Sequence, residues 1–139
     1  MTTPALIIQP YLLFDGRCEE ALEFYQRVLG ATVERIVRFK ESPEPGHNPP
    51  GSENKVMHAT VRIGATRIMA SDGHCTGRPA FAGFSLSLNV TSADEVDRLT
   101  AALAEGGQVQ LPPTKTFFSP RFAMATDRFG VSWMVIVQP

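Results

Sequence analysis

Cysteine is scarce in this chain: Cys18 and Cys75 are the only two among 139 residues. Two thiols at unrelated positions do not form a disulfide framework, so an apolar core must hold the fold together. A chain of this length buries about two-thirds of its unfolded surface, which is enough for one stable domain. We therefore expect residues 1–139 to form a single domain with both thiols reduced.

Long hydrophobic runs and an excess of one charge are also missing. The N-terminal residues MTTPALIIQP contain no cationic leader, and nowhere does the chain approach the roughly 20 apolar residues that cross a bilayer. The 13 basic and 14 acidic side chains create no long-range field that would attract polyanions. We therefore predict a cytoplasmic protein that binds neither membrane nor nucleic acid.

What the sequence does contain is one order of elements, repeated. LIIQPYLLF precedes DGRCEEALEFYQRVLGA, and FSLSLNV precedes TSADEVDRLTAALAEGG, so each half begins as a strand followed by a helix. Three more strands are predicted in each half. The predicted strands are 7–14, 32–40, 56–63 and 66–71, then 84–90, 108–111, 121–127 and 131–138. The repeats, 6–71 and 83–138, indicate an α+β fold of two βαβββ modules.

Both predicted helices carry end signals. Glu19 and Glu20 fall in the first turn of one helix, and Gly30 is suited to end it. In the second helix Thr91 or Ser92 is the expected N-cap, and Gly106-Gly107 the expected end. Between the first two strands after the first helix, residues 41–54 hold four prolines and two glycines, so we expect an irregular loop that acts as a lid.

Alternation within the strands divides each sheet into two faces. In VMHATVRI, Met57, Ala59 and Val61 share an apolar face, while His58 and Thr60 lie on the other. FSLSLNV alternates in the same way between apolar residues and a polar set of Ser85, Ser87 and Asn89. Helices should cover the apolar faces. The polar faces either line a cleft that binds a small molecule or simply contact water.

Three segments give the chain a resemblance to a known family. PYLLF-x-G-x-C-E-E-A-x-x-FY, MHA-x-x-x-I-G and DRFG-x-x-W together resemble the PhnB-like branch of the vicinal oxygen chelate superfamily, which includes glyoxalase, bleomycin-resistance proteins and extradiol dioxygenases. The resemblance implies that the two modules form a glyoxalase-like open barrel around a cleft. It also favours a homodimer, because several members build the cleft from two chains.

Catalytic members of the superfamily usually bind a divalent metal through His, Glu or Gln. The resemblance places the corresponding positions at Gln9, Met69, Ser85 and Met134. Thioethers and a neutral hydroxyl are poor ligands for Mg²⁺, Mn²⁺ or Zn²⁺. We therefore predict no metal site of the usual kind and no cofactor.

His58 is the candidate catalytic residue, because a histidine on a cleft face can act as acid, base or hydrogen-bond donor. The alternative, and the more common role of such a residue, is a structural hydrogen bond across the sheet. The predicted ligand-binding residues share the polar faces or lie at a strand entry: Gln9, Tyr11, Thr60, Arg67, Met69, Ser85, Ser87, Arg121 and Met134. The two arginines suit a carboxylate or phosphonate, although surface arginines are common.

Other reactive side chains have ordinary structural explanations. Asp72-Gly73-His74-Cys75 and His47 offer metal-ligand types, but a connector of this kind is usually a turn. Cys18 falls in a helix first turn beside two glutamates, which favours a packed thiol over a nucleophile. Trp133 alternates with Val135 and is expected in the core.

These observations predict a PhnB-like protein that binds a small polar or anionic organic molecule without a metal. A metal-dependent lyase, isomerase or dioxygenase and a sequestering, resistance-type protein are the alternatives, and enzymatic activity stays open. Some relatives carry the label demethylubiquinone methyltransferase. Asp15-Gly16-Arg17 after the first strand is not the glycine-rich turn of a nucleotide-binding βαβ unit, so we do not expect that activity.

Overall fold

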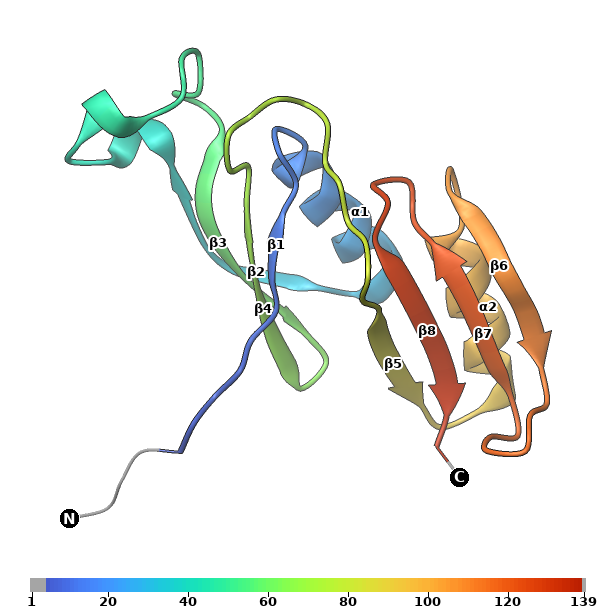
Figure 1. Cartoon of the computed structure of the whole chain (residues 1–139). Coiled ribbons are helices and arrows are strands. Elements are labelled where there is room, and N and C mark those ends of the chain that lie inside the picture. The colour runs from blue at the N-terminus through green and yellow to red at the C-terminus, as the bar shows by residue number, and fades with distance from the viewer. Residues whose placement is uncertain (1–4, 139) are drawn as a thin grey trace. The chain divides into compact units, whose positions relative to one another are not determined.

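The computed structural model describes residues 5–138 and divides the chain into two compact units, which meet in sequence between Arg78 and Pro79 (Figure 1). Each unit has the order strand, helix, three strands. The first contains β1 (Tyr11–Leu13), α1 (Cys18–Leu29), β2 (Thr32–Arg38), β3 (Val56–Ile63) and β4 (Thr66–Ser71). The second contains β5 (Leu86–Val90), α2 (Ala93–Leu103), β6 (Gln108–Thr114), β7 (Phe122–Thr126) and β8 (Ser132–Val137). The predicted α+β fold of two βαβββ modules is confirmed.

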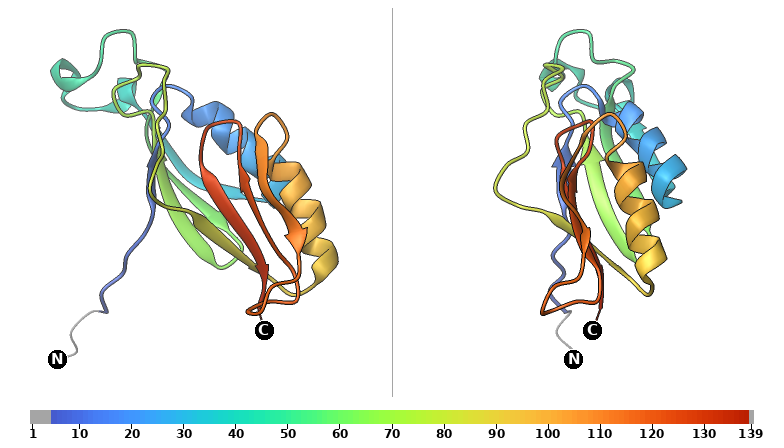
Figure 2. Two further views of the ribbon diagram at one scale, coloured as in Figure 1. Left: turned by 45° about the vertical axis from the view of Figure 1, so that its right-hand side comes forward. Right: turned by 90° about the vertical axis from the view of Figure 1, so that its right-hand side faces the viewer.

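The first sheet has the strand order β1-β4-β3-β2, with β1 parallel to β4 and the other neighbours antiparallel. Ile63 pairs with Thr66, so Gly64 and Ala65 form the predicted tight turn, with Gly64 at a φ of +58°. Helix α1 packs on one face of this sheet, as the views in Figures 1 and 2 show. Ala59, Val61 and Ala70 are buried on that face.

Helix α1 starts without a capping side chain of its own, because Arg17 at the N-cap makes no such bond. Asp72, just past β4, supplies the missing acceptor. Its Oδ1 accepts the Cys18 amide at 2.7 Å, and its Oδ2 accepts the Val56 amide at 2.6 Å. The carboxylate therefore ties α1, β3 and β4 together. At the other end Gly30 adopts the left-handed conformation with a φ of +66°, as predicted.

The second sheet repeats this topology in the order β5-β8-β7-β6, again with one parallel pair, β5 with β8. Helix α2 begins at the predicted cap, where the Ser92 hydroxyl accepts the Glu95 amide. Its buried side chains include Val96, Leu99 and Leu103. Trp133 is in the core, as predicted, at 2% exposure. Neither helix is long and apolar enough to span a membrane.

The repeat extends to the register of the strands. Met69 lies between Tyr11 and Thr60 in the first sheet, and Met134 lies between Ser87 and Met124 in the second. Both sheets have an irregularity at the same step: Val33 pairs with Val61 but Arg35 with Thr60, and Val109 pairs with Ala125 but Leu111 with Met124. Each unit therefore contains a β-bulge, at Glu34 and at Gln110.

Several predicted element bounds were wrong, and the first strands were the worst. The predicted strand 7–14 is only Tyr11–Leu13, and 84–90 is Leu86–Val90. Since Tyr11 pairs with Met69, the start of β4 at Thr66 is level with Ile8, so residues before Ile8 have no neighbouring strand. Pro10, moreover, has no amide to donate.

Three further bounds differ by two residues or more. The strand predicted at 32–40 ends at Arg38 and turns into a 3-10 helix, Phe39–Glu41. Helix α2 ends at Leu103, earlier than Gly106-Gly107 suggested. Strand β6 runs on to Thr114, through Pro112 and Pro113, which an edge strand at a register irregularity tolerates.

The loop 41–54 is largely irregular, as predicted, and contains one 3-10 turn, Pro45–His47. Backbone hydrogen bonds close its base, from Phe39 to Lys55 and from Lys40 to Glu53, each at 3.1 Å. The Asn48 amide donates to the Phe39 carbonyl at 2.9 Å. The role of this loop as a lid stays a prediction.

Candidate functional site

The side of the first sheet that faces away from α1 carries half of the ten predicted site residues. We call it the open face of the first unit. Its members are Tyr11, Leu13, Thr32, Arg35, Val37, His58, Thr60, Arg62, Arg67, Met69 and Ser71. One row crosses all four strands, because Tyr11 pairs with Met69, Met69 with Thr60, and Thr60 with Arg35. Strand register thus brings four of the predicted site residues together: Tyr11, His58, Thr60 and Met69.

His58 has a hydroxyl at each ring nitrogen. The Tyr11 Oη lies 3.0 Å from Nδ1, and the Thr60 Oγ1 lies 3.4 Å from Nε2. The Tyr11 and His58 rings meet edge to face with centroids 5.6 Å apart. Because β1 is two strands away from β3, the tyrosine reaches across β4 to hold the imidazole. The imidazole is therefore oriented from both sides.

The protonation state of Tyr11 determines whether its hydroxyl can donate the hydrogen bond to His58. Burial raises the pKa of the Tyr11 phenol above its ordinary value, the nearby Cys18 adds to that effect, and a hydrogen bond with Ser71 opposes it. The phenol is thus protonated at neutral pH and can donate to Nδ1 of a neutral imidazole. Where Nδ1 accepts from Tyr11, the proton of the neutral ring is on Nε2, which faces the Thr60 hydroxyl.

Arg67 also lies on the open face, but its guanidinium is paired. Its Nε donates to Glu34 Oε1 at 2.6 Å and its Nη2 to Oε2 at 3.4 Å. Arg62 is 3.8 Å from the same carboxylate. Both arginines lower the pKa of Glu34, Arg67 through its hydrogen bond most of all.

Gln9 does not join this group. It is exposed and lies before β1, outside the strand pairs of the first sheet. Tyr11, two residues further on, is the residue that pairs with Met69.

In the second unit, the predicted residues lie on the corresponding face of the second sheet. Ser87 pairs with Met134, which pairs with Met124. The Ser85 hydroxyl is 2.7 Å from the Ser132 hydroxyl. The Arg121 side chain pairs with α2 instead: its Nε and Nη2 are each 2.9 Å from Asp97. This face is therefore neutral and rich in methionine, unlike the open face of the first unit.

The fold family implies a metal ion, which the donors at these positions would have to bind. The resemblance implied Gln9, Met69, Ser85 and Met134, whereas the strand pairs set Tyr11 beside Met69 and Ser87 beside Met134. A phenol, a hydroxyl and two thioethers do not fit a hard or borderline divalent cation. Within residues 5–138, no three His, Cys, Asp or Glu side chains cluster in a way that would hold a metal ion.

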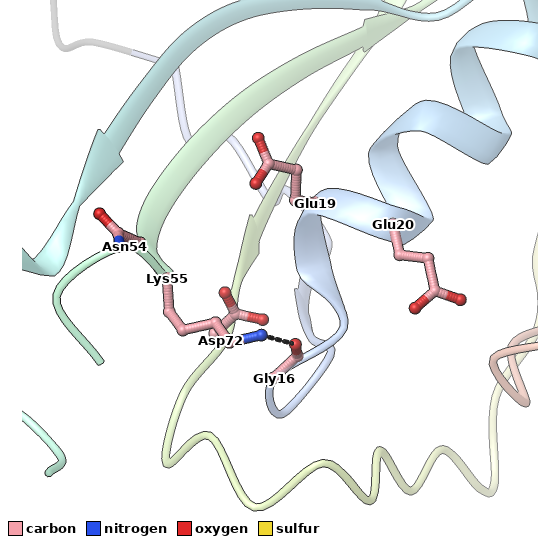
Figure 3. Close-up of a pocket in the computed structure, with 6 residues that line it drawn as sticks. All are labelled: Gly16, Glu19, Glu20, Asn54, Lys55 and Asp72. Carbon is pink, nitrogen blue, oxygen red and sulfur yellow. Dashed lines mark hydrogen bonds between the residues drawn. The ribbon is translucent and has the colours of Figure 1, made fainter. Parts of the chain in front are cut away.

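A small pocket of about 240 Å³ opens beside the start of α1 (Figure 3). Its charged side chains already have protein partners. Arg38 binds Glu19 at 2.6 Å, Arg17 binds Glu20 at 2.7 Å, and Lys55 donates to the Gly16 carbonyl at 2.8 Å. Asp72, at its floor, holds two backbone amides. The side chains around the pocket therefore connect neighbouring elements of the first unit to one another.

The remaining reactive groups are structural as well. Cys18 is buried, and burial together with Asp72 and Glu19 raises the pKa of its thiol, so it is a packed thiol. Asp72-Gly73-His74-Cys75 forms a turn, in which the Cys75 amide donates to the Asp72 carbonyl at 3.0 Å. Burial and the Asp72 carboxylate also raise the pKa of Cys75. His47 is exposed, 3.9 Å from Glu44.

Two charged residues of the open face, Arg35 and Arg62, were not among the predicted site residues. Arg62 had the right parity in the sequence. Arg35 did not, because simple alternation along 32–38 places it on the same side as Val33, under the helix. The bulge at Glu34 reverses that parity, and a bulge leaves no clear signal in a single sequence.

Comparison with known proteins identifies the family. Residues 7–136 match the family model described as 3-demethylubiquinone-9 3-methyltransferase. The chain belongs to this family. A curated relative, Protein YjdN of Escherichia coli K12, is 35% identical over 138 residues, covering 94% of each chain. Protein PA1353 from Pseudomonas aeruginosa has a solved structure that is 45% identical, with a TM-score of 0.83, covering 96% of this chain and 98% of its own.

A solved Bacillus cereus structure connects the family to the PhnB name. It is titled as a putative 3-demethylubiquinone-9 3-methyltransferase, PhnB protein, and is 28% identical with a TM-score of 0.78, covering 95% of this chain and 99% of that one. The fosfomycin resistance protein FosX of Listeria monocytogenes shares the fold at 12% identity and a TM-score of 0.67, covering 99% and 96%. The resemblance to the PhnB-like branch and the glyoxalase fold is therefore confirmed.

The methyltransferase in the family's description does not fit the fold. Adenosylmethionine-dependent methyltransferases generally have a doubly wound parallel sheet with a glycine-rich turn after its first strand. In residues 5–138 each sheet has a single parallel pair, β1 with β4 and β5 with β8. The activity of this PhnB-like protein is accordingly not fixed by its family name.

Proposed function

We propose that the open face of the first unit binds a small polar or anionic organic molecule, without the metal ion that is usual in the superfamily. One observation carries the proposal. His58 is held between the hydroxyls of Tyr11 and Thr60 on a sheet face that α1 does not cover. A ligand that covers this face is favoured when it forms hydrogen bonds with these oriented polar groups.

The arrangement also gives His58 a candidate catalytic role. With Nδ1 accepting the Tyr11 proton, the Nε2 proton is directed to Thr60, 3.4 Å away. A ligand oxygen that replaced Thr60 as acceptor would receive a hydrogen bond from Nε2, while the phenol at Nδ1 limits rotation of the ring. His58 would then act as a hydrogen-bond donor that polarises the ligand oxygen, and the phenol would keep the ring in position.

Replacing His58 by alanine should weaken the binding of ligands found in a fragment screen at least tenfold, and Tyr11→Phe should weaken it about fivefold, because each removes hydrogen bonds that hold or contact the ligand. Two-dimensional NMR of labelled protein in the presence of a chelator measures both effects and maps the site. His74→Ala is the matched control, since His74 is exposed in the connector after β4.

Amide shifts confined to other surfaces, or equal affinities for His58→Ala and His74→Ala, would count against the proposal. Folding of each variant is checked in the same spectra. Tyr11→Phe keeps the aromatic ring, so its effect separates the phenol hydroxyl from the packing of the ring against His58.

We further propose that the protein acts as a homodimer in the cytoplasm. Apolar side chains that are strongly exposed support the dimer: Leu6, Ile7 and Ile8 at 78–99%, and Phe117 at 101%. Sedimentation equilibrium showing the mass of a single chain would contradict the dimer. Recovery outside the cytoplasmic fraction of the native cell would contradict the location.

A further inference from the structure

The bulge in β2 gives the open face of the first unit a third arginine. Val33 pairs with Val61 on the side of α1, and the next paired residue, Arg35, lies opposite Thr60 on the open face. Arg35 is exposed. Residues opposite each other in an antiparallel pair project to the same side. Arg35 therefore shares its face with Arg62 and Arg67, which pair with each other across β3 and β4.

Glu34, the extra residue of the bulge, contacts two of these arginines, Arg62 and Arg67. Its carboxylate extends from β2 across β3 to Arg67 on β4, with contacts of 2.6 and 3.4 Å. Arg62, on the strand between, is 3.8 Å from the same carboxylate. One carboxylate thus bridges two guanidinium groups above the middle of the sheet.

The charges on this face do not cancel. The open face has three positively charged side chains, Arg35, Arg62 and Arg67. Among the described residues of this face and its bulge, the only negatively charged side chain is that of the bulge residue, Glu34. With His58 neutral, three positive charges and one negative charge give this group a net charge of +2. Arg35 makes no hydrogen bond or ion pair with any described residue. The Arg67 and Glu34 side chains are exposed by 57% and 29%, so water solvates the pair and a competing anion can reach it.

We propose that Arg35, Arg62 and Arg67 bind an oxyanion with two negative charges, of the phosphonate or phosphate monoester class, in the place that the Glu34 carboxylate occupies without ligand. The inference rests on the proposed function, since it names the charged group of the ligand that His58 contacts. Guanidinium groups bind tetrahedral oxyanions through paired hydrogen bonds. A dianion also matches the two uncompensated charges, which a monoanion does not.

The hydroxyls of the same face extend the site toward His58. Thr60 is opposite Arg35 and two residues from Arg62 on β3, so it lies between the arginines and the imidazole. A ligand anchored by its oxyanion near Arg62 would therefore extend an organic group along β3 over Thr60 toward His58. The arginines hold the charged end, and Tyr11 and His58 contact the remainder.

Methylphosphonate and methanesulfonate test the inference as a matched pair of probes. Both are tetrahedral and similar in size, but at pH 8.5 the first is largely a dianion and the second a monoanion. We expect methylphosphonate to bind at least tenfold more tightly at constant ionic strength, because electrostatic attraction grows with charge. Amide shifts should centre on Arg35, Arg62 and Arg67.

Variants separate the roles of the charged groups. Glu34→Gln should bind methylphosphonate about tenfold more tightly, because the amide keeps the side-chain shape but no longer competes as an anion. Arg35→Gln and Arg67→Gln should each weaken binding about tenfold. Arg98→Gln, on the exposed surface of α2, changes the net charge equally and is the control, with an expected change within about twofold.

The outcomes distinguish the two proposals. If His58→Ala abolishes binding of the screened ligands while methylphosphonate binds no better than methanesulfonate, the oxyanion site is overturned and the proposed function stands. The same holds if Arg35→Gln and Arg67→Gln behave like Arg98→Gln, or if Glu34→Gln weakens binding. If methylphosphonate binds as expected but no screened ligand responds to His58→Ala, the oxyanion site stands and the role of His58 is overturned.

Discussion

Replacing Asp127 by asparagine should lower the free energy of unfolding of the second unit by about 3 kcal/mol, because it leaves buried donors without an acceptor. The carboxylate is 2% exposed and holds the turn between β7 and β8. Oδ1 accepts the amides of Phe129 at 2.9 Å and Val131 at 3.1 Å, and Oδ2 accepts the indole N–H of Trp133 at 2.9 Å. An asparagine side chain would direct an NH₂ group at one of these donors.

Urea unfolding followed by tryptophan fluorescence measures this loss directly, because Trp133 is the single tryptophan and lies in the affected unit. Asp94→Asn is the control: Asp94 is an exposed residue in the first turn of α2, and we expect a change below about 0.5 kcal/mol. A loss for Asp127→Asn as small as the control would mean that the turn does not depend on its carboxylate.

Gly107→Ala should destabilise the protein by about 3 kcal/mol or more, through overlap with backbone that cannot move aside. A Cβ at residue 107 would overlap the Thr126 carbonyl oxygen and lie 2.7 Å from the Asp127 carbonyl carbon and 3.0 Å from the Arg128 nitrogen. The Gly107 amide also donates to the Ala104 carbonyl at 2.8 Å, which fixes the chain after α2. Relief would require β6 to separate from β7.

Gly46→Ala is the matched control for this change. A Cβ at residue 46 meets nothing within 4 Å, and the residue is in the loop 41–54, far in sequence from β6. Thermal unfolding of both variants should show a drop of many degrees for Gly107→Ala and almost none for Gly46→Ala. Equal transition temperatures would show that the β6–β7 connection tolerates a side chain.

Much of the fold follows from the sequence because its patterns are local. Period-two alternation, the Gly30 cap and the Ser92 cap each depend on neighbouring residues, and each was predicted correctly. The length of β1 was not predicted correctly, because it depends on where its neighbour β4 begins, far along the chain at Thr66. The apolar run at 6–8 looks like a strand, but only its last residue, Ile8, is level with a residue of β4.

The candidate site was predictable where strand parity is regular and unpredictable where it is not. Parity placed His58, Thr60 and Met69 on one face, and the register then brought Tyr11 to His58. Parity could not place Arg35 because of the bulge. The DRFG-x-x-W segment that helped to identify the family has its explanation in the Asp127 turn, where the aspartate binds the tryptophan and two amides.

The most direct test of ligand binding without a metal is elemental analysis of protein purified without added metal, followed by calorimetric titration of methylphosphonate with and without EDTA. We expect no stoichiometric metal and the same affinity in both buffers, because the Tyr11, Met69, Ser87 and Met134 donors suit no divalent cation of the usual kind. A stoichiometric ion, or binding that disappears with EDTA, would contradict this and would make a metal-dependent enzyme the better explanation.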